Sequence, residues 1–159
     1  MQARREPLRA GEVLNEVFES TEFIARQKGV NLRRLIEADV LLMTDRDMLS
    51  TILRNLVTNA IKYSNQGGEV ILSIGSDPED GRWAIFQVRD YGVGIPASAI
   101  SGLFEITRNS STEGTAGEKG SGMGLLLVKE MVSKLGGEIL VDSTEGKGAV
   151  FTVRLPLVD

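Results

Sequence analysis

The chain has 159 residues, of which 42% are apolar and 25% are charged, the composition of one soluble globular domain with a full core. Its net charge of −4 argues against general binding to nucleic acid or to anionic membranes. The absence of cysteine and histidine excludes disulfides, thiolate metal sites, thiol nucleophiles and every histidine-based catalytic or metal site within the chain.

The first elements lead up to one long helix. Residues 1–10 are polar and basic, and we interpret them as the trailing end of an upstream segment or as a short edge strand. The domain itself is expected to span residues 11–159. Its first helix is predicted over residues 12–28 and ends at Gly29, a residue suited to a helix C-terminus. Two short strands around a turn are predicted next, over residues 30–37 and 39–43. Asp45 is placed to cap the helix that follows.

Residues 45–64 form the most informative predicted helix. Its apolar residues recur at steps of three and four: Leu49, Ile52, Leu53, Leu56, Ala60 and Ile61. Asn55, Asn59 and Lys62 fall on one narrow stripe beside that face, with Tyr63 at its border. Carboxamide oxygens can ligate a hard cation and a lysine can hold phosphate, so the stripe is a candidate site. The alternative is a core helix with an ordinary polar flank.

Two strands follow, over residues 69–74 and 83–89, and are predicted to pair antiparallel around the turn sequence SDPEDG. Asp90 ends the second strand, and Gly92 and Gly94 come directly after it. These glycines would let the backbone approach a flat ligand closely. The carboxylate could accept a hydrogen bond from an exocyclic amine such as that of adenine. The alternative is a turn that carries a surface charge.

The next segment is predicted to be mostly irregular. A short helix is expected over residues 97–104, after Pro96. Residues 105–120 show no periodicity and are rich in Gly, Ser and Thr. We interpret them as a long loop, which is either a lid over a site or a solvated connector.

A second strongly periodic helix is predicted over residues 121–135, directly after the glycine-rich segment 120–124. Free N–H groups at its start would form a phosphate site. Its expected buried residues are Leu125, Leu126, Val128, Met131, Val132 and Leu135. A closing pair of strands is predicted around the sequence EGKG, over residues 138–141 and 149–155.

The order of these features resembles the ATP-binding domain of sensor histidine kinases, within the superfamily of gyrase, Hsp90, histidine kinase and MutL ATPases. The matching segments are NLVTNAIKYS (55–64), DYGVGI (90–95), LFE (103–105), GSGMGL (120–125) and GGEILVDSTEGKGAVF (136–151). The resemblance implies an α/β (α+β) two-layer sandwich, the Bergerat ATP-binding fold. In it, a mixed, mostly antiparallel five-stranded sheet is covered on one face by three helices. ATP would bind between the helix of residues 46–64 and the loop of residues 105–120.

The resemblance also implies roles by position. Asn59 would ligate Mg²⁺, Asn55 would support the metal and its waters, and Lys62 would contact phosphate, which makes these three the catalytic residues. Tyr63 would pack over ribose or adenine, and Asp90 would bind the adenine amino group. The other implied nucleotide-binding residues are Gly92, Gly94, Ile95, Lys119, Gly120, Ser121, Gly122, Met123, Gly124 and Leu125.

Two positions depart from the family pattern. Thr107 stands where many members carry a second Phe after Phe104, which affects how the loop would pack. Ala149 stands where a Thr is often found, so one polar contact near adenine would be lost or replaced by water. Arg108 or Lys119 would add positive charge from the loop.

The implied function is that of a histidine kinase catalytic domain that binds ATP and Mg²⁺. Because the chain has no histidine, the phosphoryl acceptor must lie on a separate dimerisation domain. That domain would pass the group to an aspartate of a response regulator. The resemblance implies a homodimeric full-length protein, a monomeric isolated domain and a cytoplasmic location, alone or as the cytosolic part of a membrane-bound sensor. No nucleic acid partner is expected.

Three alternatives remain open from the sequence. An ATP-hydrolysing clamp of the gyrase or Hsp90 type carries a Glu at the position of Asn55, because attack by water needs a general base. An anti-sigma serine kinase also usually carries an acidic residue at that helix position. A degenerate nucleotide-binding or regulatory module is disfavoured by the intact Asn59, Asp90 and glycine loops, while Thr107 and Ala149 keep it open.

Overall fold

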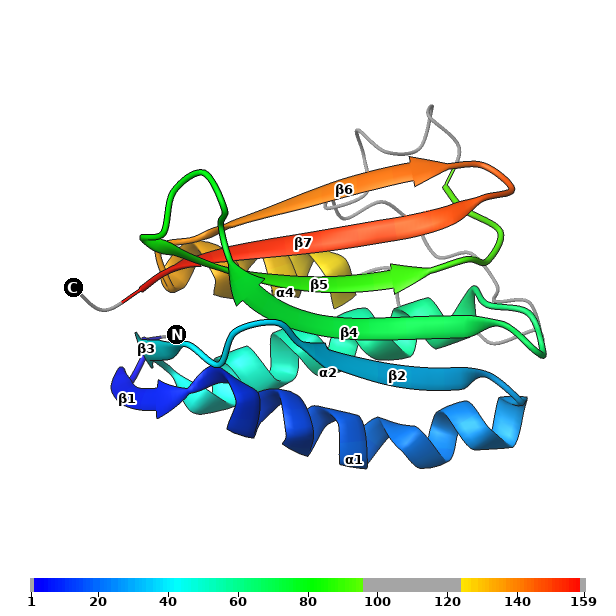
Figure 1. The fold of residues 1–159 in the computed structure, drawn as a ribbon, viewed down its shortest axis with the longest axis horizontal. Helices are drawn as coiled ribbons and strands as arrows, with labels where there is room; N and C mark the ends of the chain where they lie inside the picture. Colours follow the sequence, from blue (N-terminus) through cyan, green and yellow to red (C-terminus); the bar gives the residue numbers. More distant parts are fainter. Residues whose placement is uncertain (1, 96–123, 158–159) are drawn as a thin grey trace.

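The computed structural model describes residues 2–95 and 124–157, and its centre is a five-stranded sheet (Figure 1). The strands are β2 (Asn31–Ile36), β4 (Glu69–Ser76), β5 (Trp83–Asp90), β7 (Gly148–Pro156) and β6 (Glu138–Thr144), in that spatial order. β2 runs parallel to β4, and the other neighbouring pairs are antiparallel. The predicted mixed, mostly antiparallel sheet is therefore confirmed, as are both predicted antiparallel pairs.

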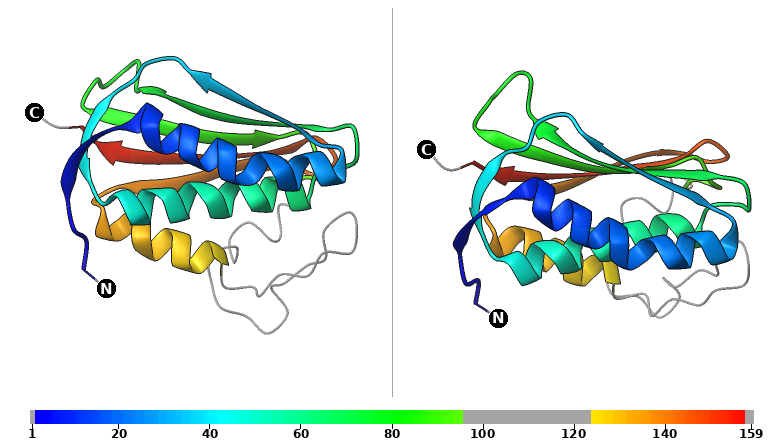
Figure 2. Two further views of the ribbon diagram at one scale, coloured as in Figure 1. Left: turned by 90° about the horizontal axis from the view of Figure 1, so that it is seen from below. Right: turned by 60° about the horizontal axis from the view of Figure 1, so that its bottom comes forward.

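The helices of the described residues lie together on one face of this sheet (Figure 2). They are α1 (Ala10–Lys28), α2 (Arg46–Lys62) and α4 (Gly124–Lys134). The opposite face carries no described helix, so the predicted two-layer sandwich is confirmed. None of the described helices is both long enough and apolar enough to cross a membrane. The helix predicted over residues 97–104 and the loop predicted over residues 105–120 lie outside the described residues.

The core lies between the two layers. Its residues recur at the spacing of one side of a strand or one face of a helix. On β4 and β5 every second side chain is buried: Val70, Leu72, Ile74, Ala84, Phe86 and Val88. The six apolar residues predicted to be buried on α2 are all buried. Burial is also confirmed for Val128, Met131, Val132 and Leu135. Leu125 and Leu126 are only half-buried, so their prediction was wrong. They lie in the first turn of α4, where few described elements pack against the helix.

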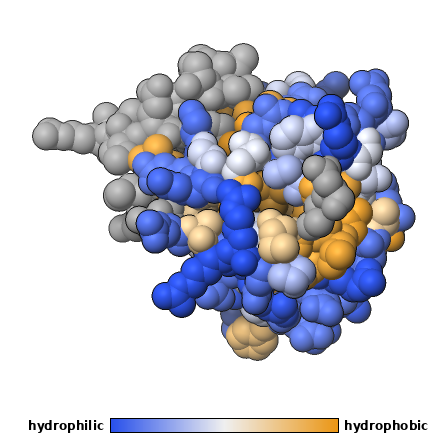
Figure 3. Space-filling model, turned by 90° about the vertical axis from the view of Figure 1, so that its left-hand side faces the viewer, coloured by the Kyte–Doolittle hydropathy of each residue, from blue (hydrophilic) through white to orange (hydrophobic). Residues whose placement is uncertain are grey.

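The two strands predicted around residue 38 both exist, but they belong to different sheets. The chain leaves β2 through Glu37, whose N–H donates to the carbonyl of Ile74 at 2.9 Å. β3 (Leu41–Thr44) instead pairs antiparallel with β1 (Glu6–Arg9). Residues 6–9 are therefore a short strand, as one of the two sequence interpretations expected. On the side of the molecule that carries β1 and β3, hydrophilic residues surround an apolar area (Figure 3). Leu41 and Met43 of β3 are 48% and 43% exposed.

Asp45 fastens the N-terminal segment to the start of α2. Its Oδ1 accepts from the N–H of Met48 at 3.0 Å, and its Oδ2 accepts from the N–H of Arg4 at 2.8 Å. The predicted cap is thus confirmed, and it serves two segments. Burial by itself raises the pKa of the Asp45 carboxyl, but the backbone N–H groups of Met48, Arg4 and Asp47 outweigh it and the pKa is lowered.

Asp45→Ala should lower the free energy of unfolding by about 1–2 kcal/mol, because two backbone N–H groups lose their acceptor. Since the pKa of Asp45 is lowered in the folded state, its contribution is present at neutral pH. It is lost as the pH falls from about 4 through the folded-state pKa. Urea denaturation at pH 7 and at pH 3 measures both effects. The control is Asp47→Ala, an exposed acid of the same turn, expected to cost less than about 0.5 kcal/mol. Equal losses in the two variants would contradict the capping role.

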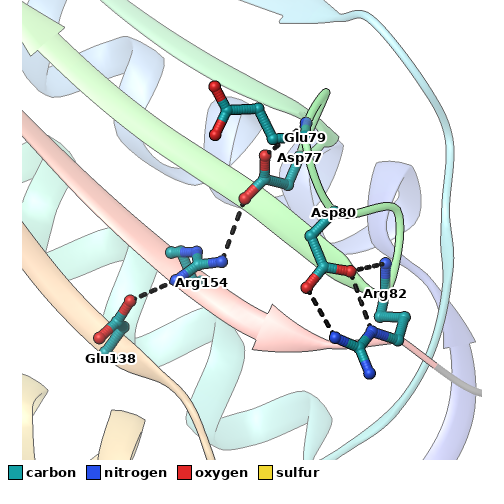
Figure 4. A network of polar contacts seen from close by, with 6 residues as sticks. All are labelled: Asp77, Glu79, Asp80, Arg82, Glu138 and Arg154. Atoms are coloured by element: carbon teal, nitrogen blue, oxygen red, sulfur yellow. Dashed lines mark hydrogen bonds and ion pairs between the residues drawn. The ribbon is translucent and has the colours of Figure 1, made fainter.

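Arg154 of β7 joins three parts of the sheet at the end where β5 begins (Figure 4). Its Nη2 lies 3.0 Å from Asp77 in the turn between β4 and β5, and its Nη1 donates to Glu138 of β6. In the same turn, the Arg82 guanidinium donates to both carboxylate oxygens of Asp80 and lowers the pKa of that carboxyl to about 2. These polar contacts stand apart from the other end of β5, where Asp90 lies.

Candidate functional site

The elements that carry the described candidate residues approach one another toward the right-hand end of the sandwich in Figure 1. The C-terminal ends of α2 and β5 and the turn between β6 and β7 lie at that end, and α4 begins nearer the middle. The candidates that the structure describes are Asn55, Asn59, Lys62, Tyr63, Asp90, Gly92, Gly94, Ile95, Gly124 and Leu125. The candidates outside the described residues are Arg108, Lys119, Gly120, Ser121, Gly122 and Met123.

The polar stripe of α2 lies half-buried along the border of its apolar face. The Nδ2 group of Asn55 donates to the carbonyl of Thr51 at 2.8 Å, which fixes the carboxamide on the helix. Its Oδ1 is directed at the start of α4, because a Cβ built on Gly124 would lie 3.6 Å from this oxygen. The carboxamide of Asn59 has no hydrogen bond to any described residue. The Nζ of Lys62 lies 5.0 Å from the centre of the Tyr63 ring.

Asp90 is a buried carboxyl at the end of a central strand, only 5% exposed. Its Oδ1 accepts from the N–H of Gly92 at 2.9 Å. Burial raises the pKa of Asp90, while hydrogen bonds from the backbone of Gly92 and Ala149 act in the opposite direction. A buried carboxyl with a raised pKa is typical of functional sites. The alternative of a surface charge at this position is excluded by the burial.

The two glycines after Asp90 are required by close contacts with protein backbone. A Cβ on Gly92 would lie 2.0 Å from the carbonyl oxygen of Tyr63. Gly94 has a φ of +71°, and a Cβ there would lie 2.2 Å from the carbonyl oxygen of Thr144. The sequence suggested close approach to a ligand. In the described residues, the close approach is to α2 on one side and to the β6–β7 turn on the other.

Hydrogen bonds fix this loop between the same two neighbours. The N–H of Val93 donates to the carbonyl of Tyr63 at 3.2 Å, and the carbonyl of Val93 accepts from Gly146 at 2.7 Å. The N–H of Ile95 donates to Oγ of Ser143 at 2.7 Å. The loop that follows Asp90 is thus tied to the end of the helix that carries Asn59 and Lys62.

Two residues with a place in this arrangement were missed in the sequence. Ser143 of β6 accepts from Ile95 and donates to the carbonyl of Gly148 at 2.9 Å. Lys28, the last residue of α1, donates to two carbonyls at the end of α2. A lysine at a helix end is ordinarily assigned to its own helix, so no local signal pointed to α2.

Ala149, a departure from the family pattern, lies opposite Asp90 in the pairing of β5 with β7. Its side chain is buried and apolar, so it brings no polar group to the carboxyl. Among the described residues, no group of three or more acidic side chains could hold a metal ion.

Comparison with known proteins gives relatives of one family. A family model described as histidine kinase-, DNA gyrase B- and HSP90-like ATPase matches residues 44–159. The sensor histidine kinase WalK of Bacillus subtilis (strain 168) is 34% identical over 155 residues, which are 98% of this chain and 25% of WalK. This chain therefore spans about a quarter of the length of that relative.

Two solved structures are similar over nearly the whole chain. The mycobacterial sensor histidine kinase MprB has a TM-score of 0.80 at 26% identity, covering 97% of this chain and 98% of that one. Full-length ShkA in complex with AMPPNP has a TM-score of 0.84 at 26% identity, covering 99% of this chain and 32% of ShkA.

Proposed function

The chain belongs to the family of histidine kinase-, DNA gyrase B- and HSP90-like ATPases, and we propose that it is the catalytic ATP-binding domain of a two-component sensor histidine kinase. The observation that carries the proposal is the hydrogen bond between Val93 and Tyr63. It ties the loop after the buried Asp90 to the end of α2, so that a candidate adenine-binding carboxyl and candidate phosphate-binding side chains belong to one site.

The described residues suit a nucleotide. Asp90 would accept a hydrogen bond from the adenine amino group, in a buried position where a charge-assisted bond is strong. Gly92, Gly94 and Ile95 would form the wall beside adenine, and Tyr63 would pack over adenine or ribose. In the motif of residues 119–125, the glycines would face the phosphates. Lys119 of this motif, or Arg108 before it, would add positive charge.

The α2 stripe suits Mg²⁺ and phosphate. The carboxamide of Asn59 is half-buried and makes no hydrogen bond to a described residue, so its oxygen fits a hard cation. When bound, Mg²⁺ would neutralise charge on the phosphates. Asn55, held through its Nδ2, would support the metal and its waters, and Lys62 would contact phosphate. Asn55 cannot remove a proton from water, which disfavours the ATP-hydrolysing clamp.

The reaction we propose is phosphoryl transfer to a histidine outside this chain. The histidine nitrogen forms a bond to the γ-phosphorus, the bond to the bridging oxygen breaks, and ADP leaves. Such transfer depends on positioning and charge stabilisation more than on a strong base. A separate dimerisation domain would supply the histidine, and a response regulator aspartate would then receive the group.

We also propose a domain arrangement for the whole protein. Residues 11–159 would be the catalytic domain, and residues 1–10 the end of an upstream dimerisation segment, although β1 is paired within the domain. The isolated domain would be monomeric and the full-length protein a homodimer. The domain would work in the cytoplasm, alone or as the cytosolic part of a membrane-bound sensor.

Transfer to a histidine-bearing helical hairpin of the same protein tests the proposal. With labelled ATP and Mg²⁺, the domain alone should release phosphate very slowly and should not label itself, since it has no histidine. Adding the hairpin should produce acid-labile, base-stable label on the hairpin. Rapid phosphate release without the hairpin would instead favour the clamp, and label on a partner serine would favour the anti-sigma kinase.

A further inference from the structure

Lys28 belongs to α1 in sequence, but it completes the end of α2. Its Nζ donates to the carbonyls of Ile61 at 2.9 Å and of Lys62 at 2.8 Å. These are among the last carbonyls of α2, which have no N–H donor within the helix itself. The carbonyl of Ile61 also accepts from the N–H of Ser64 at 3.2 Å, just beyond the helix. The ammonium group from the neighbouring helix is therefore a second donor to Ile61 and a donor to Lys62.

The end of α1 does not depend on Lys28. Its C-cap is Gly29, in the left-handed conformation with a φ of +78°. The N–H of Gly29 donates to the carbonyl of Arg26, and the N–H of Val30 donates to the carbonyl of Ala25, so backbone groups satisfy two of the last carbonyls of α1. The placement of Lys28 is thus explained by what it does for α2.

The end of α2 carries a partial negative charge at the point where the proposed site needs to accept phosphates. A helix C-terminus is equivalent to about half a negative charge, located on its last free carbonyls. The side chain of Lys62, which would contact phosphate, comes from this same turn. An ammonium group on the carbonyls of residues 61 and 62 offsets a charge that would otherwise repel the ligand.

The same turn also positions the rest of the site. The N–H of Tyr63 donates to the carbonyl of Asn59 at 3.2 Å, and Oγ of Ser64 donates to Ala60 at 2.8 Å. The carbonyl of Tyr63 then accepts from Val93 in the loop after Asp90. The turn that Lys28 completes therefore lies between the candidate phosphate side and the candidate adenine side.

We propose that Lys28 is a positioning residue of the nucleotide site, which neutralises the C-terminal end of α2 so that phosphates can bind beside it. This inference rests on the proposed ATP-binding function. In this role Lys28 would act through the carbonyls of α2 and not through contact with the nucleotide. Because its effect is electrostatic, it should increase with the number of phosphates and decrease with added salt.

The test measures the affinity of the domain for ATP with Mg²⁺, for ADP and for adenosine by calorimetry. Lys28→Met keeps the apolar stem and removes the charge, and it should weaken ATP binding by about 10-fold. Adenosine binding should change by less than about twofold, since adenosine has no phosphate. Lys28→Arg should restore ATP binding to within about threefold of wild type. Arg26→Met, an exposed position of the same turn, whose guanidinium pairs with Glu22, is the matched control and should leave all three affinities unchanged.

The outcomes separate electrostatic positioning from mere support of the fold. If Lys28→Met loses ATP and adenosine affinity equally, or loses no ATP affinity, the inference is overturned. The proposed function still stands in that case, because the wild type binds ATP. A wild-type domain that is folded but binds no ATP would overturn the proposed function, and the inference with it. If Lys28→Met does not fold, Lys28→Gln keeps a donor without the charge and gives the same comparison.

Discussion

Asp90→Asn should weaken ATP binding by about 10- to 100-fold, because a neutral amide replaces a buried, charge-assisted acceptor. An asparagine fills the same space, and its oxygen can still accept from Gly92, so the loop after β5 should keep its conformation. Calorimetry with ATP and Mg²⁺ measures the loss. Asp80→Asn, at the other end of β5, is the matched control and should bind as the wild type does. Unchanged affinity for ATP in Asp90→Asn would show that this carboxyl does not recognise adenine.

The same variant should not destabilise the empty domain at neutral pH. Burial raises the pKa of Asp90 in the folded state, so the charged form is disfavoured there. The contribution of this group to stability is therefore fully present below the unfolded-state pKa of about 4, and it is lost as the pH rises through the folded-state pKa. At pH 7 the charge costs stability, and Asp90→Asn should melt at the same temperature as the wild type or higher.

Thermal denaturation between pH 3 and pH 8 measures the stability that Asp90→Asn gains over the wild type. This gain should shrink as the pH falls through the folded-state pKa of Asp90, and it should be absent below about 4, where Asp90 is protonated in both states. Asp45 also titrates in this range, but it is present in both proteins and its effect cancels. A large fall in the melting temperature of Asp90→Asn at pH 7 would show instead that the carboxylate supports the fold.

Asn59→Ala should reduce Mg²⁺-dependent phosphoryl transfer to the histidine-bearing hairpin by about 100-fold or more, because the proposed metal ligand is lost. The stability of the domain should change by less than about 0.5 kcal/mol. The side chain is half-buried, it has no hydrogen bond to a described residue, and alanine is the better helix former. Labelling of the hairpin at several Mg²⁺ concentrations measures the loss.

Binding measurements show whether the loss in Asn59→Ala concerns the metal. Affinity for ATP in the presence of a chelator should be close to that of the wild type, and the gain on adding Mg²⁺ should be smaller. Asn65→Ala, which removes the same kind of side chain from an exposed position beyond α2, should transfer normally. Full transfer by Asn59→Ala would assign the metal to other groups.

Local order could be predicted from the sequence because it depends on residues near one another in the chain. The spacing of Leu49, Ile52 and Leu56 defines a helix face, and Asp45 before it defines a cap. Alternation in β4 and β5 defines strands with one buried side. The absence of histidine alone placed the phosphoryl acceptor of any histidine kinase reaction outside this chain. The order of the motifs was enough to identify the family.

The tertiary structure decided what depends on residues far apart in the chain. Two strands adjacent in sequence, β2 and β3, entered different sheets because their partners, β4 and β1, lie elsewhere in the chain. Lys28 donates to the carbonyls of Ile61 and Lys62 at the end of α2, which lie 33 and 34 residues later in the chain. Asp45 and Asp90 are the same residue type, yet their pKa values shift in opposite directions. Backbone N–H groups outweigh burial at Asp45, whereas burial dominates at Asp90, and only the packed fold determines how much water each carboxyl keeps.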